Sequence, residues 1–365
     1  MEENRLKNIV EPLLAWFDGN ARVLPWREEP TPYRVWISEI MLQQTRVEAV
    51  KPFYERFLEA LPDIPSLAAC PEDRLLKLWE GLGYYNRARN LQKAAQVLVS
   101  EYQAEMPPDY DAIRGLPGIG PYTAGAVASI AYGIPVPAVD GNVLRVLSRI
   151  LTLEEDVLKQ SVKRRMEEQI QAVIPKERPG AFNQALMELG ATVCVPNGPA
   201  KCGVCPLHGL CLANQEGRTG EFPKKTPKKA RKIEERTVLV IRDGERAAIR
   251  KRPDKGLLAG LYELPNLPGR LGREDVLRQL EDWGMVPVHI RPLKEAKHIF
   301  SHIEWHMTGY AVRVAQLEQS VQEGLLFVEP FRTEKDYPIP AAFAAYTEEL
   351  QIRLGQEKYE AEIGL

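Results

Sequence analysis

The spacing of apolar residues divides the chain into a helical first part and a mixed second part. Residues 1 to about 215 are predicted to be mostly helical, with helical periodicity over 33–61, 87–99 and 142–150. A helix rich in small residues is predicted from Pro121 to Tyr132, because a proline stands in its first turn. The prolines and glycine that follow it predict a stiff loop before Asp140.

The composition changes between residues 221 and 235, where Lys, Pro and Thr dominate and indicate a linker. Beyond it, alternating patterns predict strands at 236–242 and 246–250 around the turn signal Asp243-Gly244, and further strands at 286–291 and 305–314. We therefore expect a helical domain over 1–220, a basic linker over 221–235, an α+β domain over 236–350 and a tail over 351–365.

Composition fits a two-domain globular protein of 365 residues, with 44% hydrophobic and 27% charged residues. The polar N-terminus is unlike a signal peptide and no long apolar run is present, so a cytoplasmic protein is expected. The formal net charge is −2, so any nucleic-acid contact must come from local basic patches. One such run, which also fits a solvated linker, comprises Lys224, Lys225, Lys228, Lys229, Arg231 and Lys232.

The segment LPGIGPYTAGAV places Gly118 and Gly120 in a tight turn between two short helices. Backbone N–H groups at the start of a helix bind phosphate without reading the bases. A plain helix–helix corner explains the same pattern, so the turn alone leaves both interpretations open.

Two carboxylates are candidates for chemistry. Asp140 stands just before a predicted helix, where an N-cap role and stabilisation of a cationic transition state are compatible. Glu39 lies on the same side of its helix as Trp36 and Ile40; it is either solvated or, if buried, raised in pKa and able to hold a proton at neutral pH. A raised Glu beside an ionised Asp is a known acid/base pairing.

Five cysteines are present, and Cys70, which stands alone, is expected to be a small core residue. Cys194, Cys202, Cys205 and Cys211 are clustered, which in a cytosolic protein favours a metal over disulfides. Zinc is the first candidate from cysteine count, although only one CxxC pair occurs.

Long, ordered segments of the first 220 residues resemble the MutY-type adenine DNA glycosylases of the helix-hairpin-helix superfamily. The matching segments are LPWR (24–27), SEIMLQQTRVEAV (38–50), WEGLGYYNRARNL (79–91), LPGIGPYTAGAV (116–127), AVDGNVLRVLSR (138–149), FNQALMELGA (182–191) and the cysteine cluster. The resemblance implies a mainly α helix-hairpin-helix glycosylase domain with a [4Fe–4S] module, followed by an α+β Nudix-like domain.

The resemblance also assigns roles in catalysis. Glu39 matches the general acid that protonates adenine, and Asp140 matches the residue that stabilises the oxocarbenium-like sugar. Asn142 matches a residue that orients Asp140, and Tyr122 a position near the sugar. Endonuclease III-like lyases have a lysine at the Tyr122 position; because a phenol forms no Schiff base, a monofunctional glycosylase is implied.

Further matched positions imply how DNA is bound. Gln44, Leu82 and Tyr84 fall in segments that enter the duplex, where an aromatic ring replaces lost stacking; Tyr84 also fits ordinary packing. Trp26, Arg27 and Gln184 match the adenine pocket, and Gly118 and Gly120 match the phosphate-binding turn.

In the second domain, Phe300, Ser301 and His302 match a loop that contacts 8-oxoguanine, although FSH alone is an unremarkable turn. The segment REDVLRQLEDWG lacks the Glu-rich pattern of a working Nudix hydrolase.

By the same resemblance, the four clustered cysteines hold one structural [4Fe–4S] cluster per chain, with one extra residue in the first gap. The expected partner is double-stranded DNA containing A:8-oxoguanine or A:G mispairs, bound by a monomer that works without a membrane, on the nucleoid if the source is a bacterium. No protein partner is indicated.

Two alternative functions remain open. One is an endonuclease III-like glycosylase and lyase acting on oxidised pyrimidines, which Tyr122 and the second domain disfavour. The other is a non-catalytic damage-binding module, which the presence of Glu39 and Asp140 opposes.

Overall fold

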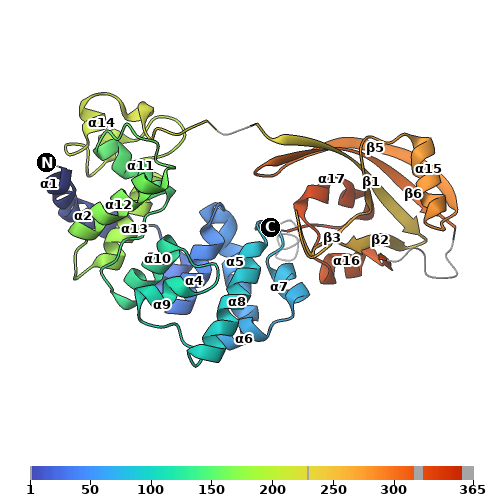
Figure 1. Cartoon of the computed structure of the whole chain (residues 1–365), viewed down its shortest axis with the longest axis horizontal. Helices are drawn as coiled ribbons and strands as arrows, with labels where there is room; N and C mark the ends of the chain where they lie inside the picture. Colours follow the sequence, from blue (N-terminus) through green and yellow to red (C-terminus); the bar gives the residue numbers. More distant parts are fainter. Residues whose placement is uncertain (1, 228–229, 316–323, 356–365) are drawn as a thin grey trace. The chain divides into compact units, whose positions relative to one another are not determined.

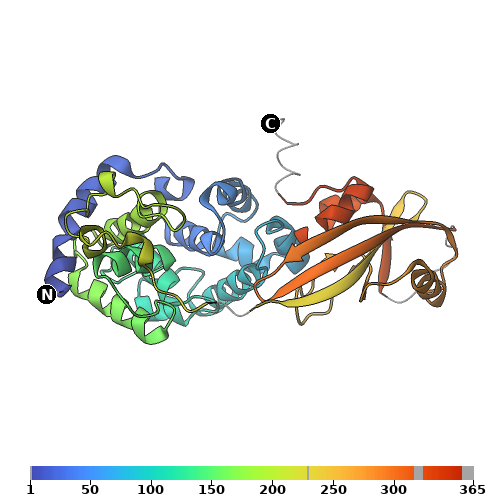
Figure 2. The ribbon, with the colours of Figure 1, turned by 90° about the horizontal axis from the view of Figure 1, so that it is seen from above.

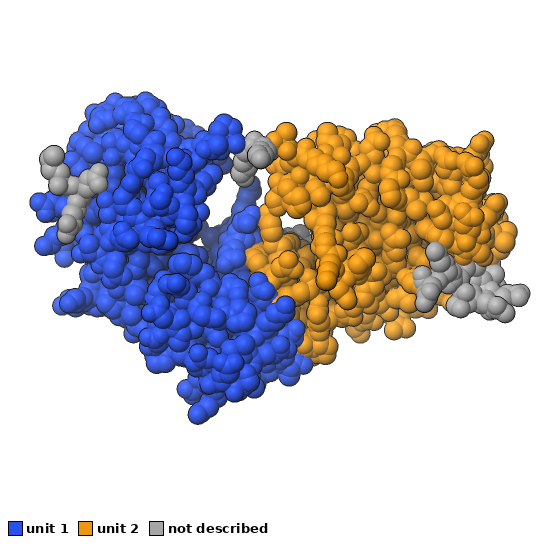
Figure 3. Space-filling model, viewed as in Figure 1, with its two compact units in different colours: residues 1–69, 90–228 blue, residues 70–89, 229–365 orange. Residues whose placement is uncertain are grey.

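A computed structural model describes residues 2–227, 230–315 and 324–355 (Figures 1 and 2). It divides into two compact units (Figure 3). The first unit comprises residues 1–69 and 90–228, and the second comprises residues 70–89 and 229–365. The segment 70–89 therefore belongs to the unit formed by the second half of the chain. Two residues of the basic run, Lys228 and Lys229, and residues 356–365 of the expected tail lie outside the described residues.

The first unit is helical, as the apolar spacing predicts. Its helices are α1 (Glu2–Asn8), α2 (Val10–Asn20), α3 (Pro25–Glu28), α4 (Pro32–Leu42), α5 (Val47–Ala60), α6 (Ile64–Ala69), α9 (Tyr110–Gly115), α10 (Pro121–Tyr132), α11 (Gly141–Ile150), α12 (Gln160–Val173), α13 (Pro179–Thr192) and α14 (Leu212–Gln215), with 3-10 turns η1 (Cys202–Val204) and η2 (Thr219–Glu221). Helix α8 (Asn86–Glu101) begins in the second unit and ends in the first. The predicted helices over 87–99, 121–132 and 142–150 are confirmed by α8, α10 and α11.

The predicted helical stretch over 33–61 forms two helices, α4 and α5, rather than one. The chain is extended at Gln43 and left-handed at Gln44, with φ +59°, so the helix cannot continue there. Helix α4 is almost wholly buried, whereas α5 is amphipathic and buries Val50, Phe53 and Phe57. The interruption leaves Gln44 exposed at the end of a rigid element.

The core around α11 positions the second candidate carboxylate. Helices α1, α2, α11, α12 and α13 bury one apolar cluster that includes Leu13, Val143, Leu147 and Phe182, each fully buried. Burial of a side chain of this size contributes about 1.5–3 kcal/mol. Helix α11, which starts immediately after Asp140, is thus held on several sides by packing.

The second unit is built on a mixed seven-stranded sheet with the order β3-β2-β1-β6-β5, in which β4 pairs with β1 and β7 with β2. Its elements are α7 (Glu72–Leu78), β1 (Lys232–Asp243), β2 (Arg246–Lys251), β3 (Tyr262–Glu263), β4 (Asn266–Pro268), α15 (Arg273–Asp282), β5 (Pro287–Ile299), β6 (Ile303–Val314), β7 (Leu325–Val328), α16 (Pro330–Asp336), η3 (Ala341–Phe343), α17 (Ala344–Thr347) and η4 (Glu348–Leu350). The four predicted strands correspond to β1, β2, β5 and β6, and the hairpin at Asp243-Gly244 is confirmed by the pairing of Asp243 with Arg246.

The two faces of this sheet are covered by different helices. Leu239 and Ile241 of β1 pack with Val276 and Leu280 of α15. Their neighbours on β1, including Val238, point to the opposite face, where they pack with residues of η3 and α17. Figure 2 shows β5 and β6 running side by side as long antiparallel strands, with residues 300–302 at the turn between them. None of the helices in the described part of the chain combines the length and apolar character that a bilayer span requires.

Candidate active site and DNA-binding elements

Glu39 occupies the inner face of α4. Thr31 caps this helix by accepting the Arg34 N–H, and Pro32 stands in its first turn, so the helix begins at a defined point. Only 6% of Glu39 is exposed. The Tyr122 hydroxyl, from the first turn of α10, donates a hydrogen bond to Glu39 Oε2. The sequence leaves burial of Glu39 open, and the structure establishes it.

Burial changes the acidity of Glu39. Burial, aided by the nearby Asp140 charge, outweighs the Tyr122 hydrogen bond and the Arg27 charge, which act to lower the pKa of this carboxyl. The net effect raises that pKa to about 7. Burial also raises the pKa of Tyr122 well above its ordinary value. Glu39 is therefore partly protonated at neutral pH, as a general acid must be.

Asp140 is the N-cap of α11, as the sequence predicts. Its Oδ1 accepts the Val143 N–H at 2.8 Å, and its Oδ2 accepts the Asn142 amide at 2.7 Å. Burial nevertheless raises the pKa of Asp140, and these hydrogen bonds, with the Arg145 charge, oppose the rise. The hydrogen bonds that favour the carboxylate form thus only partly offset the effect of burial on its pKa.

The loop before Asp140 is fixed by two residues that the sequence analysis did not single out. A Cβ on Gly125 of α10 would lie 2.0 Å from the Pro137 carbonyl oxygen, so only glycine lets the loop approach. Asn183, fully buried on α13, accepts the Ala138 N–H at 3.1 Å and donates to the Val136 carbonyl at 2.9 Å. Their residue types gave no signal, because buried Asn and helical Gly are common without a functional reason.

Arg145 extends the Asp140 network toward the cysteines. It donates to Asn142 Oδ1 at 2.8 Å and to the Cys194 carbonyl at 2.8 Å. Asn142 in turn has no space for a larger neighbour, because a Cβ on Gly190 would lie 2.6 Å from the Asn142 Cβ. The sequence does not single out Arg145, because a basic residue on an amphipathic helix usually lies on its solvated face.

A second polar group lies on the same unit around Arg27. Arg27 donates to Gln184 at 3.1 Å and pairs with Glu188 at 2.9 Å, while Arg22 pairs with the other oxygen of Glu188 at 2.6 Å. Glu188 is 1% exposed, and these two cations hold its pKa below the ordinary value despite burial. Trp26 is buried edge-on against Tyr54. The structure thus brings Arg27 and Gln184 together, with Glu188 as an unpredicted third member.

The hairpin between α9 and α10 has the predicted form. Gly118 has φ +74° and a Cβ there would lie 2.5 Å from the Asn90 Cβ, so glycine is required. Gly120 is the N-cap of the twelve-residue helix α10. Both glycines are exposed, which leaves backbone groups of the turn accessible to solvent.

The four clustered cysteines line one small cavity together with Arg149. Arg149 donates to Cys194 Sγ at 3.1 Å, and Cys211 Sγ donates to the Arg149 carbonyl at 3.3 Å. Among the described residues, no three His, Cys, Asp or Glu side chains converge as ligands of a single ion. Four cysteine side chains around one cavity are a donor set that suits either zinc or an iron–sulfur cluster. Cys70 is buried elsewhere, as expected.

Leu82 and Tyr84 lie in a turn of the second unit that follows α7. Leu82 is 5% exposed and Tyr84 is 48% exposed. Tyr84 has φ +49°, unusual for a residue with a large side chain. The Trp79 indole and the Arg87 guanidinium both donate to the Gly83 carbonyl, at 3.1 and 3.0 Å. The turn is therefore closed by its own neighbours and presents the tyrosine ring outward.

Phe300, Ser301 and His302 form the turn between β5 and β6. Phe300 packs edge-on against Trp305 with ring centroids 5.0 Å apart, and its N–H donates to the Ile303 carbonyl. Ser301 and His302 are exposed. The Arg231 guanidinium, from the basic run, donates to the Phe300 carbonyl at 3.1 Å, so this member of the run supports the turn.

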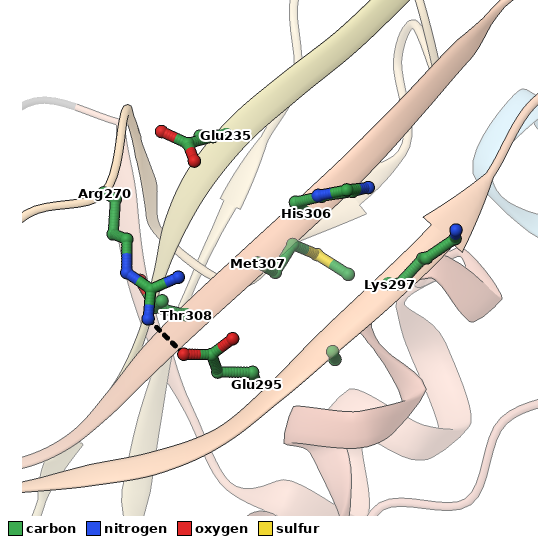
Figure 4. A pocket seen from close by; sticks show the side chains of 8 residues that line it. Glu235, Arg270, Glu295, Lys297, His306, Met307 and Thr308 are labelled. Atoms are coloured by element: carbon green, nitrogen blue, oxygen red, sulfur yellow. Dashed lines mark hydrogen bonds and ion pairs between the residues drawn. The ribbon is translucent and has the colours of Figure 1, made fainter. Parts of the chain in front are cut away.

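A polar hollow of about 270 Å³ is lined by residues of β1, β5 and β6 together with Arg270 (Figure 4). Arg270 binds Glu295 within the hollow, and the lining residues Lys297 and His306 both contact Glu304, which lies outside the lining. Each of these basic side chains therefore already has a carboxylate partner.

Two family models match separate parts of the chain. Residues 37–172 match the HhH-GPD superfamily of base excision DNA repair proteins, and residues 237–349 match a NUDIX domain. The predicted combination of a helix-hairpin-helix glycosylase fold with a Nudix-like α+β fold is confirmed.

Curated relatives match across both units. The human adenine DNA glycosylase is 33% identical over 94% of this chain and 74% of its own length. That of Buchnera aphidicola subsp. Schizaphis graminum is 33% identical over 83% of this chain and 87% of its own.

Solved structures match the helical part. A thermostable thymine-DNA glycosylase is 29% identical with a TM-score of 0.52, covering 58% of this chain and 98% of that one. An endonuclease III trapped as a covalent intermediate with DNA is 27% identical with a TM-score of 0.50, covering 59% and 98%.

Proposed function

Because this chain belongs to the adenine DNA glycosylase family of the MutY type, it is a base-excision glycosylase that removes adenine, and we propose that this adenine stands opposite 8-oxoguanine or guanine in duplex DNA. The observation that carries the chemistry is the buried, partly protonated Glu39 in the electrostatic field of Asp140.

The two carboxyl groups divide the work. Protonated Glu39 donates its proton to the flipped adenine, so the base leaves as a neutral molecule. Asp140 stabilises the positive charge that develops on the sugar, held by Asn142 and the α11 N-terminus. Water then attacks the sugar, and the carboxylate form of Glu39 accepts a proton from it.

Tyr122 supports a monofunctional reaction. Its side chain has no amine and is bonded to Glu39, so it forms no imine with the sugar. Arg27 and Gln184, with Trp26 beside them, are proposed to line the adenine pocket. A base that cannot hydrogen-bond to these side chains would leave them buried without a partner, and the pocket would therefore discriminate against it.

DNA binding is proposed to use both units. Gly118 and Gly120 grip a phosphate at the start of α10. Gln44, Leu82 and Tyr84 enter the duplex, and the turn at Phe300, Ser301 and His302 reads 8-oxoguanine. An aromatic ring that replaces one lost base stack contributes about 1–3 kcal/mol.

A [4Fe–4S] cluster, one per chain, is proposed to be held by Cys194, Cys202, Cys205 and Cys211. When bound, it supplies four thiolate–iron bonds that cross-link this part of the chain. Arg149 places a positive charge at Cys194 Sγ, which offsets negative charge there. The protein is proposed to act as a monomer on chromosomal DNA in the cytoplasm, with residues 1–220 as the catalytic module and 236–350 as the recognition module.

The decisive experiment measures base release from duplexes that carry A:8-oxoguanine, A:G or an oxidised pyrimidine. We expect adenine release from the first two, no release of the pyrimidine, and no adduct on borohydride reduction. Adenine spared opposite 8-oxoguanine would contradict the substrate, and a trapped adduct would favour the lyase alternative. Equal release by wild type and Asp140→Asn would reopen a non-catalytic role.

A further inference from the structure

The turn that carries Tyr84 is tied to the end of the described chain by buried contacts. Glu80, which precedes the turn, is 1% exposed. Its Oε1 accepts the Ile339 N–H at 2.8 Å, and its Oε2 pairs with Lys77 at 2.8 Å. Lys77, itself 8% exposed, also donates to the Tyr337 carbonyl at 2.9 Å. A buried ion pair is costly unless further hydrogen bonds support it, and here the 337–339 backbone supplies one to each partner.

A second contact touches the turn directly. A Cβ on Gly355 would lie 3.0 Å from the Cα of Gly81, so the two backbones are packed against each other. Gly81, at φ +103°, begins the turn, and Gly83 and Tyr84 also have positive φ. The two glycines adopt positive φ at little cost, whereas a tyrosine in the left-handed region persists only when its surroundings hold it.

We propose that residues 337–355 act as a clasp that holds the turn 81–84 in the shape that presents Tyr84 to the duplex. Glu80 and Gly355 are then positioning residues for mispair recognition, separate from the turn at Phe300–His302. The inference rests on the proposed role of Tyr84 in entering the duplex, and the experiment below separates the two.

The first measurement needs no DNA. In the holoprotein, Gly355→Ala is expected to speed amide hydrogen exchange across residues 81–85, because the added methyl displaces Gly81. The matched control is Gly284→Ala, also in the second unit and at positive φ (+74°), where a Cβ meets nothing within 4 Å. Glu80→Gln, which keeps the acceptor for Ile339 but removes the charge opposite Lys77, is expected to act in the same direction. Unchanged exchange at 81–85 in both Gly355→Ala and Glu80→Gln overturns the clasp.

The second measurement uses a duplex in which 2′-fluoro-2′-deoxyadenosine, which resists cleavage, opposes 8-oxoguanine. Gly355→Ala is expected to weaken binding roughly tenfold, the order of one lost base–aromatic stack. In a Tyr84→Ala background the same substitution is expected to have no further effect, whereas it stays additive with Phe300→Ala.

The outcomes separate the two ideas. If Gly355→Ala shows faster exchange at 81–85 but binds the duplex with full affinity, and Tyr84→Ala also binds with full affinity, the clasp is retained and the duplex role of Tyr84 is refuted. A Gly355→Ala affinity loss that persists undiminished in the Tyr84→Ala background refutes the clasp as the route to Tyr84.

Discussion

Tyr122 donates its phenolic hydrogen to Oε2 of Glu39, and this bond joins the first turn of α10 to the buried face of α4. The bond stabilises the ionised form of Glu39 against the effect of burial, so it sets where the acid titrates. Excision of adenine is therefore expected to fall as pH rises through about 7, because Glu39 loses the proton that it must donate.

Tyr122→Phe is expected to move this falling limb to higher pH, since removal of the hydrogen bond raises the pKa of Glu39. Single-turnover excision between pH 5 and 9 measures the shift. Tyr132→Phe, the same substitution on the same helix with its hydroxyl bonded to the Met106 carbonyl, is the control and is expected to leave the limb in place. A limb that stays near pH 7 or moves to lower pH in Tyr122→Phe would contradict the assignment of Glu39 as the acid.

Glu39→Gln is expected to stabilise the protein in a pH-dependent way while removing activity. The folded-state pKa of about 7 exceeds the ordinary 4.5, so wild type loses stability as pH rises from 4.5 to 7 and the neutral amide does not. The difference in unfolding free energy is expected to be near zero at pH 4 and about 3 kcal/mol at pH 8. Urea unfolding at both pH values tests this, with the exposed Glu55→Gln as control. Equal stabilisation at both pH values would show that Glu39 is not raised in pKa.

Gly125→Ala is expected to reduce excision by at least about 100-fold, because a methyl group 2.0 Å from the Pro137 carbonyl must displace the loop that ends at Asp140. Gly115→Ala, in open space at the end of α9, is the control and should retain wild-type rates. Folding is followed by circular dichroism. A folded Gly125→Ala protein with full activity would refute the need for this close approach.

Asn183→Leu is expected to destabilise the first unit by about 1–3 kcal/mol, since it leaves the buried Ala138 N–H without its acceptor. Asn183→Asp keeps the acceptor for Ala138, but an ionised carboxylate has no hydrogen to donate to Ser129 or Val136. A protonated carboxyl keeps one donor, so we expect Asn183→Asp to lose less stability than Asn183→Leu only at a pH where the carboxyl is protonated. The melting temperature of each variant measures stability, and a separate excision assay on the folded protein at 25 °C measures activity. A fully stable Asn183→Leu protein would rule out the proposed support of the loop.

Cys202→Ala is expected to remove visible absorbance and lower iron from about four atoms per chain, whereas Cys70→Ala should leave both unchanged. Iron analysis and the absorbance spectrum of freshly purified protein provide the measurement. If the wild-type protein contains zinc and no iron, the four cysteines form a zinc site and the proposed cluster is refuted.

Local sequence signals predict much of this fold. Apolar spacing predicts α8, α11 and the strands β1, β2, β5 and β6, and a run of small residues with a proline in its first turn predicts α10. The break at Gln43 and Gln44 is not visible in that pattern, since apolar spacing continues across it while the backbone turns. The N-cap role of Asp140 is local and therefore predictable.

Other parts of the candidate site depend on contacts between distant segments. Asn183 supports the Asp140 loop from α13, and Glu188 pairs with Arg22 and Arg27 across more than 160 positions of sequence. Burial of Glu39, and hence its raised pKa, arises from the packing of α4 against α10, which a single helix pattern does not specify. The resemblance to known glycosylases supplies roles for matched positions but not for these supporting residues.

The segment 70–89 belongs to a unit whose remaining residues lie after position 228. Leu75, Leu76 and Trp79 of this segment are fully buried, and α7 packs against α16. During synthesis from the N-terminus, these apolar side chains leave the ribosome long before the strands and helices that complete their unit. The second unit therefore cannot finish folding until the residues after 228 that pack against this segment have been synthesised. A chain truncated in the linker would keep the helical unit but leave the apolar side chains of residues 70–89 exposed.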